Sequence, residues 1–184
     1  MSMPLLVRIS GLVGILLTAG AGLGQPPFPK PGPEYEILKK LEGVWEATVK
    51  SSFEPGKPPT ESKGTATYKL ECQGMWLSSE FLGAFAGMPF QGKGLDGYDP
   101  AKKKYVGVWV DSMGGAPMIS EGTYDKDKKT LTMISDYTGP DGKPAKFKMV
   151  TEYKDNDNFV FTMTTPGPGG KDVEMMTISY KRKK

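Results

Sequence analysis

The stretch from Gly92 to Gly122, GKGLDGYDPAKKKYVGVWVDSMGGAPMISEG, has the pattern of three strands joined by two tight turns. Side chains alternate between the two faces of a strand, and both faces of the middle segment, Lys104–Ser112, carry apolar residues. One face carries Tyr105, Trp109 and Asp111, and the other carries Val106, Val108 and Val110. Because a strand that is apolar on both sides is usually covered on both, we expect this segment at the centre of a sheet.

The rest of the chain after Gly43 has the same character. Short apolar runs alternate with turn-forming segments such as Asp99–Lys102, Asp125–Lys128 and Pro140–Gly142. We expect strands over residues 44–53, 61–70, 75–82, 90–98, 104–112, 117–124, 130–138, 145–154, 158–164 and 173–182. No helical period interrupts this series, which excludes alternating strand–helix–strand units.

About ten short strands joined by tight hairpins predict an all-β fold, an up-and-down antiparallel β-barrel. Closing the sheet into a barrel removes the exposed edge strands. A barrel of this size has an interior wide enough for a small ligand. The same strand pattern permits a β-sandwich of two sheets, which is the alternative.

Residues 1–24 have the features of a secretory signal peptide, because Arg8 precedes a short apolar run that small residues follow. Cleavage is expected after Ala21 or Gly24, and an uncleaved N-terminal anchor is the alternative. The protein is therefore predicted to be exported, either periplasmic or secreted. Residues 25–33 form a proline-rich linker, and residues 34–184 form the barrel domain.

Residues 34–42, EYEILKKLE, are the one segment with a convincing helical pattern. Their apolar side chains recur every third residue and form one stripe, from Tyr35, Leu38 and Leu41. Pro33 is suited to the start of this helix and Gly43 to its end. A helix this short needs packing to be stable, so we expect it to lie against one end of the sheet.

The composition limits the chemistry. The 184 residues include no histidine and a single cysteine, Cys72, which excludes Ser-His-Asp or Cys-His catalysis, histidine-ligated zinc or haem, and an intramolecular disulfide. The formal net charge of +3 is too small for a nucleic-acid partner. We assign no catalytic residue, no metal and no cofactor, and expect no stable membrane insertion after signal cleavage. The oligomeric state is left open.

The letters Gly92-x-Gly94-x-x-Gly97 match the fingerprint of dinucleotide-binding proteins. That fingerprint requires a helix directly after the glycines, whereas a turn follows them here. We interpret these glycines as positions where a barrel strand bends.

Several short motifs are similar to those of a known family. They are Leu41–Trp45 (LEGVW), Gly97–Pro100 (GYDP), Trp109–Ser112 (WVDS) and Glu121–Gly122. Together they resemble the bacterial domain-of-unknown-function family DUF1579, over about residues 36–182. Within the first motif, Gly43-Val44-Trp45 resembles the G-x-W signature of lipocalins and related calycin barrels. The resemblance implies a calycin-like, lipocalin-like β-barrel and implies no established activity.

Several strands carry chemistry-bearing side chains among apolar ones. Trp76 shares a strand face with Glu80, and Trp109 shares one with Asp111, while Glu121 lies in a later strand. Carboxylates inside an apolar barrel would be the few polar groups that are typical of a small-molecule site. These five residues are therefore the ligand-binding candidates. The alternative is that their strand faces point outward and that solvent covers the carboxylates.

Gly83–Phe90 is an apolar segment between the expected third and fourth strands. Loops are usually polar, so its large side chains, Phe85, Met88 and Phe90, need a specific role. We interpret the segment as a portal loop that forms a lid or plug at the barrel mouth, with a membrane or partner contact as the alternative. Residues 113–117 are expected to form a second loop on the same rim.

These observations favour non-catalytic binding of a small, partly apolar molecule inside an exported β-barrel. The second hypothesis is an enzyme, a hydrolase or isomerase, that uses interior carboxylates. The third is a structural or interaction module whose barrel is filled by its own side chains. An open cavity would support the first two hypotheses, and a solid core would support the third.

Overall fold

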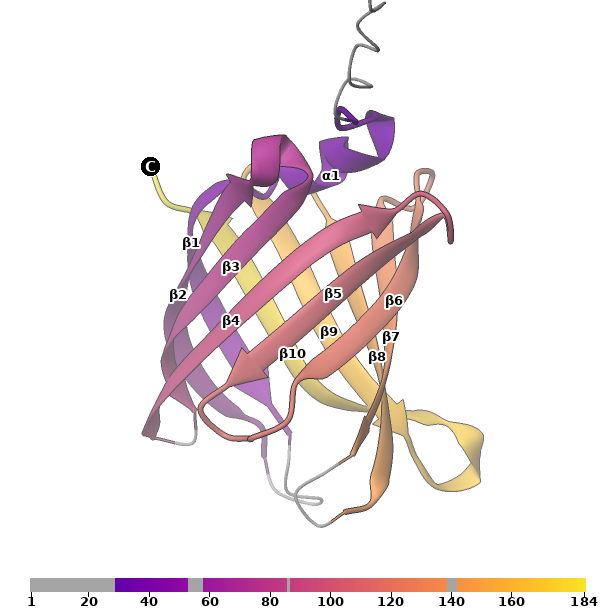
Figure 1. Cartoon of the computed structure of the whole chain (residues 1–184). Helices are drawn as coiled ribbons and strands as arrows, with labels where there is room; N and C mark the ends of the chain where they lie inside the picture. The colour runs from indigo at the N-terminus through magenta and orange to yellow at the C-terminus, as the bar shows by residue number, and fades with distance from the viewer. Residues whose placement is uncertain (1–28, 53–57, 86, 139–141) are drawn as a thin grey trace, which may run out of the picture.

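The computed structural model describes residues 29–52, 58–85, 87–138 and 142–184. Ten antiparallel strands form one closed barrel (Figure 1). They are β1 Gly43–Ser51, β2 Thr60–Glu71, β3 Trp76–Phe85, β4 Met88–Asp99, β5 Lys104–Asp111, β6 Met118–Asp125, β7 Thr130–Thr138, β8 Pro144–Tyr153, β9 Asn158–Pro166 and β10 Asp172–Arg182. The predicted all-β barrel is confirmed, and the two-sheet sandwich is not the fold.

Pairing between the first and last strands closes the barrel. β1 lies between β2 and β10, with Trp45 opposite Arg182 and Ser51 opposite Met176. Every other pairing joins strands that follow one another in the sequence. The closed ladder leaves no edge strand whose backbone groups would remain unpaired.

Short helical segments cover one end of the barrel (Figure 1). η1 (Pro33–Tyr35) and α1 (Glu36–Lys39) occupy the segment that was expected to be helical, and they bury their apolar side chains against the strands. We call this the closed end, and the opposite end the open end. Two further single turns, η2 (Cys72–Gly74) and η3 (Pro168–Gly170), connect strands. Within the described ranges, no helix is long and apolar enough to cross a membrane.

Trp45 and Arg182 join β1 to β10 at the closed end. Trp45 is almost completely buried, and its Nε1 donates to the backbone oxygen of Leu41 at 2.7 Å. The Arg182 guanidinium lies 4.1 Å from the centroid of the Trp45 ring. It donates to the backbone oxygens of Lys40 and Glu42, each at 2.6 Å. The same side chain therefore covers the indole and binds the free carbonyls at the end of the helical segment.

The glycine of the G-x-W motif is required by this arrangement. Gly43 has a φ of +124°, a conformation that residues with a Cβ atom rarely adopt. A Cβ atom there would also lie only 2.8 Å from Nη1 of Arg182. Gly43 therefore gives the chain its turn into β1 and leaves room for the arginine.

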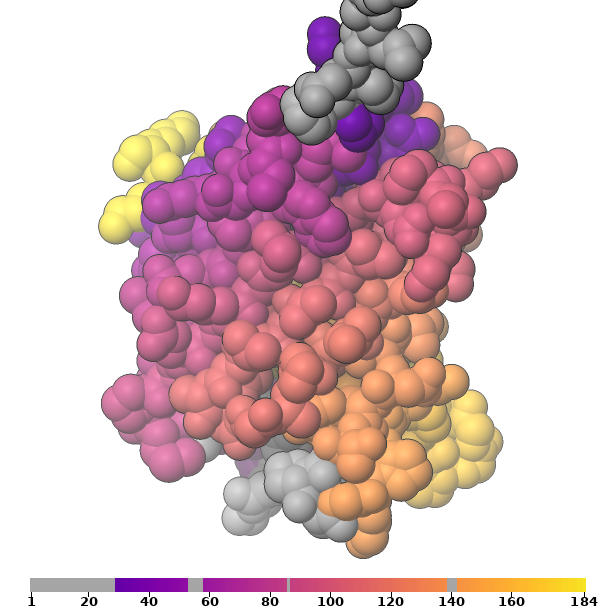
Figure 2. Space-filling model, viewed as in Figure 1, coloured from indigo at the N-terminus to yellow at the C-terminus, as the bar shows by residue number. Residues whose placement is uncertain are grey.

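The outer face of β5 carries exposed apolar side chains, which corrects one expectation. β5 does have a neighbouring strand on each side, but Val108 and Val110 on its outer face are 42% and 47% exposed. Leu95, Val108 and Ile119 are register partners and form an apolar row across the wall that faces the viewer in Figure 2. The prediction that β5 is covered on both faces is wrong, because a closed barrel encloses only one face of each strand.

We predict that Arg182→Ala lowers the free energy of unfolding by about 2 kcal/mol, because it removes hydrogen bonds to backbone carbonyls and the contact with the indole. Lys181→Ala is the matched control, since the Lys181 side chain is exposed on the preceding position of β10. Urea denaturation of both variants at neutral pH measures the difference. Equal stability of the two variants would contradict the role assigned to Arg182.

Candidate ligand-binding cavity

A cavity of about 530 Å³ lies inside the barrel. Residues from all ten strands and from α1 line it, and most of their side chains are aromatic or aliphatic. The flexible apolar side chains among them are Met113, Met118, Met133, Met149, Met163 and Met176. The interior is therefore not filled by the protein's own side chains.

The cavity has a floor and a mouth. Leu38 and Leu41 line it at the closed end, so the N-terminal helical segment forms the floor. Residues at the open end line the mouth, among them Phe85, Phe90 and Ala116. The expectation that segments 83–89 and 113–117 lie on one rim is confirmed, since residues of both line the same end of the cavity.

Trp109 and Asp111, two of the predicted ligand-binding residues, line the cavity. The indole Nε1 of Trp109 donates to Oδ2 of Asp111 at 2.9 Å, and the backbone N–H of Met113 donates to Oδ1 at 2.8 Å. Gly94 of β4 is the register partner of Trp109, and a Cβ atom there would lie 3.1 Å from Cε3 of the indole. The glycines of β4 therefore provide the space for a tryptophan inside the barrel, and both oxygens of Asp111 already accept hydrogen bonds.

Trp76, Glu80 and Glu121 do not line the cavity and lie on the outer wall. Glu80 forms an ion pair with Lys93 at 3.4 Å. Glu121 pairs with two lysines near the start of β5, and their hydrogen bonds hold the pKa of Glu121 below its ordinary value. The alternative of an outward-pointing, solvated carboxylate therefore applies to Glu80 and Glu121. Trp76 and Glu80 do share a face, but it is the outer one.

The residues predicted to form a portal loop lie in a tight hairpin. β3 extends to Phe85, and β4 begins at Met88. The rings of Phe85 and Phe90 line the cavity with centroids 6.1 Å apart, whereas Met88 is 60% exposed. The expected long loop is wrong, because most of the segment 83–90 pairs as strands despite its glycines. A gating role for these side chains stays a prediction.

Asp96 is an interior carboxyl that is not among the predicted ligand-binding residues. It lies on β4 opposite Gly107 of β5 and lines the cavity. A Cβ atom at Gly107 would lie 2.5 Å from Oδ1 of Asp96, so this glycine provides the space for the carboxyl. Burial raises the pKa of Asp96 from 3.8 to about 7, because apolar surroundings disfavour the charged form. Among the described residues, no ion pair or hydrogen bond is found for this carboxyl.

Tyrosine side chains accompany Asp96 toward the closed end. The phenols of Tyr68 and Tyr180 interact with each other. The hydroxyl of Tyr153 is buried and has no hydrogen-bond partner in the part of the chain that the structure describes. Burial raises the pKa of all three phenols, and the charge of Asp96 raises those of Tyr68 and Tyr153 further. We call Tyr68, Asp96, Tyr153 and Tyr180 the deep polar cluster.

The ionisable groups of the cavity are acidic or phenolic. The carboxyls are Asp96 and Asp111, and no lysine or arginine of the described residues lines the cavity. Asp96 lies four residues beyond Gly92, the register partner of Asp111, which places the two positions about 13 Å apart along the strand. The two carboxyls therefore do not form a close acid–base pair. The described residues also contain no cluster of acidic side chains and cysteine that could hold a metal ion.

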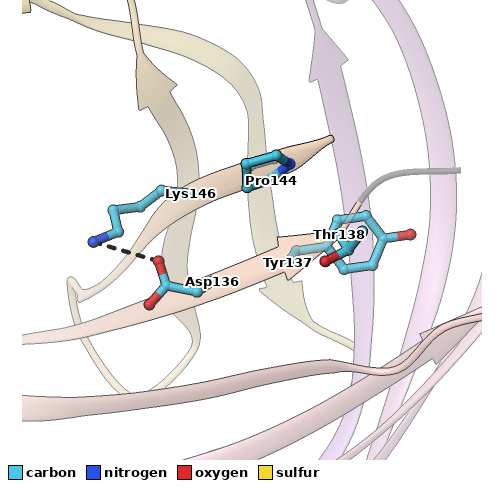
Figure 3. A pocket seen from close by; sticks show the side chains of 6 residues that line it. Asp136, Tyr137, Thr138, Pro144 and Lys146 are labelled. Carbon is cyan, nitrogen blue, oxygen red and sulfur yellow. Dashed lines mark ion pairs between the residues drawn. The ribbon is translucent and has the colours of Figure 1, made fainter. Parts of the chain in front are cut away.

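A second pocket, of about 360 Å³, lies at the open end of β7 and β8. Asp136 and Lys146 point toward one another there and form an ion pair at 3.3 Å (Figure 3). Their side chains are 79% and 56% exposed, and such a solvated pair has little binding energy to offer. The interior cavity, which combines apolar walls with buried polar groups, is the stronger candidate site.

The amino-acid sequence matches a family described as proteins of unknown function, DUF1579, over residues 30–182. The chain belongs to the DUF1579 family. The predicted family is therefore confirmed. The Gly43–Trp45 motif of this chain lies at the closed end of the barrel. No curated protein matches the sequence.

The fold of this DUF1579 protein is similar to two solved structures of low sequence identity. Rv2717c from M. tuberculosis is 14% identical with a TM-score of 0.62, over 83% of this chain and 99% of that chain. The S-type phycobiliprotein lyase CPES from Guillardia theta is 13% identical with a TM-score of 0.59, over 84% of this chain and 99% of that chain. At such identities the likeness shows the fold alone, a closed antiparallel β-barrel.

We predict that Asp96 makes the barrel less stable as the pH rises. The carboxyl titrates at its ordinary value in the unfolded chain and near pH 7 in the barrel, so the destabilisation is absent below about pH 4 and complete above about pH 7. The difference between 3.8 and about 7 corresponds to about 4 kcal/mol. Asp96→Asn should therefore be the more stable protein at pH 8, by up to that amount, and similar to the wild type at pH 4.

Chemical denaturation of wild type and Asp96→Asn at several pH values measures this difference. Glu80→Gln is the matched control, because it removes a carboxylate from the outer wall of the neighbouring strand. Its free energy of unfolding should follow that of the wild type at every pH. Parallel pH dependences of wild type and Asp96→Asn would show that Asp96 is not held in a destabilised charged state.

Proposed function

We propose that the barrel binds a small, predominantly apolar molecule and does not transform it. The observation that carries this proposal is the cavity of about 530 Å³, a size within the range of about 300–1,000 Å³ that is typical of ligand pockets. Aromatic rings give its walls a large contact area, and methionines adapt to irregular apolar shapes. A few polar groups at fixed positions would orient the bound molecule.

The cavity argues against a barrel that serves only as a rigid module. An unfilled apolar interior lowers stability, because its lining side chains lose packing contacts. A purely structural barrel gains from larger side chains at such positions. Flexible methionines line the cavity instead, for example Met118, Met149 and Met176.

The same geometry favours binding over catalysis. A reactive site brings a proton donor or acceptor within hydrogen-bond reach of a second working group. Asp96 has a pKa suited to proton transfer, but Asp111 is distant from it and already accepts two hydrogen bonds. The remaining ionisable groups near Asp96 are phenols with raised pKa values, which makes them poor bases or nucleophiles.

We also propose that the protein works outside the cytoplasm. Support for this comes from the charge, apolar run and small residues of segment 1–24, which lies outside the described residues. A barrel that binds apolar molecules would have a use there, because such molecules are poorly soluble in the aqueous phase.

We predict that the neutral fluorescent probe N-phenylnaphthylamine binds the purified protein saturably. Met118→Trp should weaken this binding by about tenfold or more, because an indole in place of the methionine fills part of the cavity. Ile119→Trp is the matched control, since Ile119 is the next residue of β6 and is 59% exposed on the outer wall. Fluorescence titration gives the dissociation constant of each variant.

A wild-type protein that shows no saturable binding would contradict the proposed function, as would equal losses in the two variants. Native mass spectrometry of protein purified from its own exported fraction complements the titration. The mass of a reproducible adduct would give the chemical class of the natural ligand.

For export, we predict that the intact mass of the protein from an extracytoplasmic fraction corresponds to a chain that begins after Ala21 or Gly24. Deletion of residues 1–24 should keep the protein in the cytoplasm. Recovery of the uncleaved chain from a membrane fraction would instead support the N-terminal anchor.

A further inference from the structure

The deep polar cluster contains two polar groups for which the described residues provide no partner. The Asp96 carboxyl lines the cavity without an ion pair or hydrogen bond, and the Tyr153 hydroxyl is buried without an acceptor or donor. Buried polar groups are nearly always hydrogen-bonded in folded proteins, and an unmet one is destabilising by about 1–3 kcal/mol. The Asp96 carboxyl belongs to the cavity wall, so a molecule in the cavity can reach it.

The charge of the cavity selects among such molecules. Its carboxyls are Asp96 and Asp111, and no lysine or arginine among the described residues lines it. An anionic head group, such as a carboxylate, would meet like charge and an apolar wall. A protonated nitrogen would supply the ion pair and the hydrogen bond that Asp96 lacks.

The position of Asp96 also sets the orientation of the molecule. Asp96 lies toward the closed end, where Leu38 and Leu41 form the floor, whereas the aromatic rings of Phe85 and Phe90 lie at the mouth. A ligand that reaches Asp96 from the open end therefore enters with its polar group first. Its apolar body then lies against the aromatic rings and methionines behind it.

We propose that the ligand of this barrel is an apolar molecule with a basic nitrogen, a protonated amine or amidine, which binds the Asp96 carboxylate at the deep end of the cavity. This inference rests on the proposed function and names the ligand class for the same site. Asp111 is not the primary partner, because Trp109 and the backbone of Met113 already donate to it.

The experiment uses matched probes that differ only in their polar group: naphthylmethylamine, naphthylmethanol and naphthoate. Each displaces N-phenylnaphthylamine from the full chain, which gives three dissociation constants on one apolar body. We expect the amine to bind at least about tenfold more tightly than the alcohol, and the naphthoate to bind most weakly. Asp96→Asn should remove the preference for the amine, so that the amine and the alcohol bind this variant with similar affinity. Glu80→Gln, on the outer wall, should leave both unchanged.

The pH dependence provides a readout that needs no variant. Between pH 6 and pH 8 the amine should bind about tenfold more tightly, because the fraction of ionised Asp96 rises through its pKa of about 7. Tyr68 and Tyr153 interact electrostatically with Asp96, and both stay neutral in this range because burial raises their pKa values. The alcohol should bind equally at both pH values.

The outcomes separate the inference from the proposed function. Equal binding of amine and alcohol, or a preference that survives Asp96→Asn or is lost on Asp111→Asn instead, would overturn the assignment to Asp96 and leave the binding function intact. Tighter binding of naphthoate would overturn the ligand class. If neither the naphthyl compounds nor N-phenylnaphthylamine bind, the proposed function itself fails.

Discussion

The hydrogen-bonded pairing of β1 with β10 is the constraint on which the rest of this structure depends. It closes ten strands into a barrel. Side chains alone can nearly fill the interior of an eight-stranded barrel, whereas ten strands enclose a wider one. The Trp45–Arg182 contact lies on this seam and also binds the helical segment that forms the floor. Closure therefore produces three features together: a ladder without edges, one covered end, and an interior with unfilled volume.

The sequence predicts the strands well and predicts poorly which face of each strand is inside. Turn-forming residues mark the strand ends, so the observed bounds lie within three residues of those expected. Trp76 with Glu80 and Trp109 with Asp111 have the same alternating pattern, yet the first pair lies on the outer wall and the second lines the cavity. The pairing register with the neighbouring strands decides which face is inside. The local pattern does not reveal this, because the outer face of a strand such as β5 can also be apolar.

The alternating pattern of side chains does not identify Asp96 as a residue of the candidate site. It stands between Leu95 and Gly97 in a glycine-rich segment that reads as a bent strand, and a single acidic residue there is most often solvated. Its significance comes from Gly107, which lies opposite on the next strand and provides the space for the carboxyl. One signal was available in the sequence. Position 96 lies on the same strand face as Gly92 and Gly94, and these glycines leave space for the side chain of Trp109.

The deep carboxyl is hard to explain by stability. An asparagine would fill the same space without a charge to desolvate, whereas burial of Asp96 disfavours its carboxylate and raises its pKa. The surrounding phenols cannot neutralise it, because they are themselves uncharged groups. A cation entering the cavity would stabilise the charged form and gain an ion pair in apolar surroundings, where it is strong. Relief of the unfavourable buried charge would then contribute to the affinity for the ligand and to selectivity for a positively charged one.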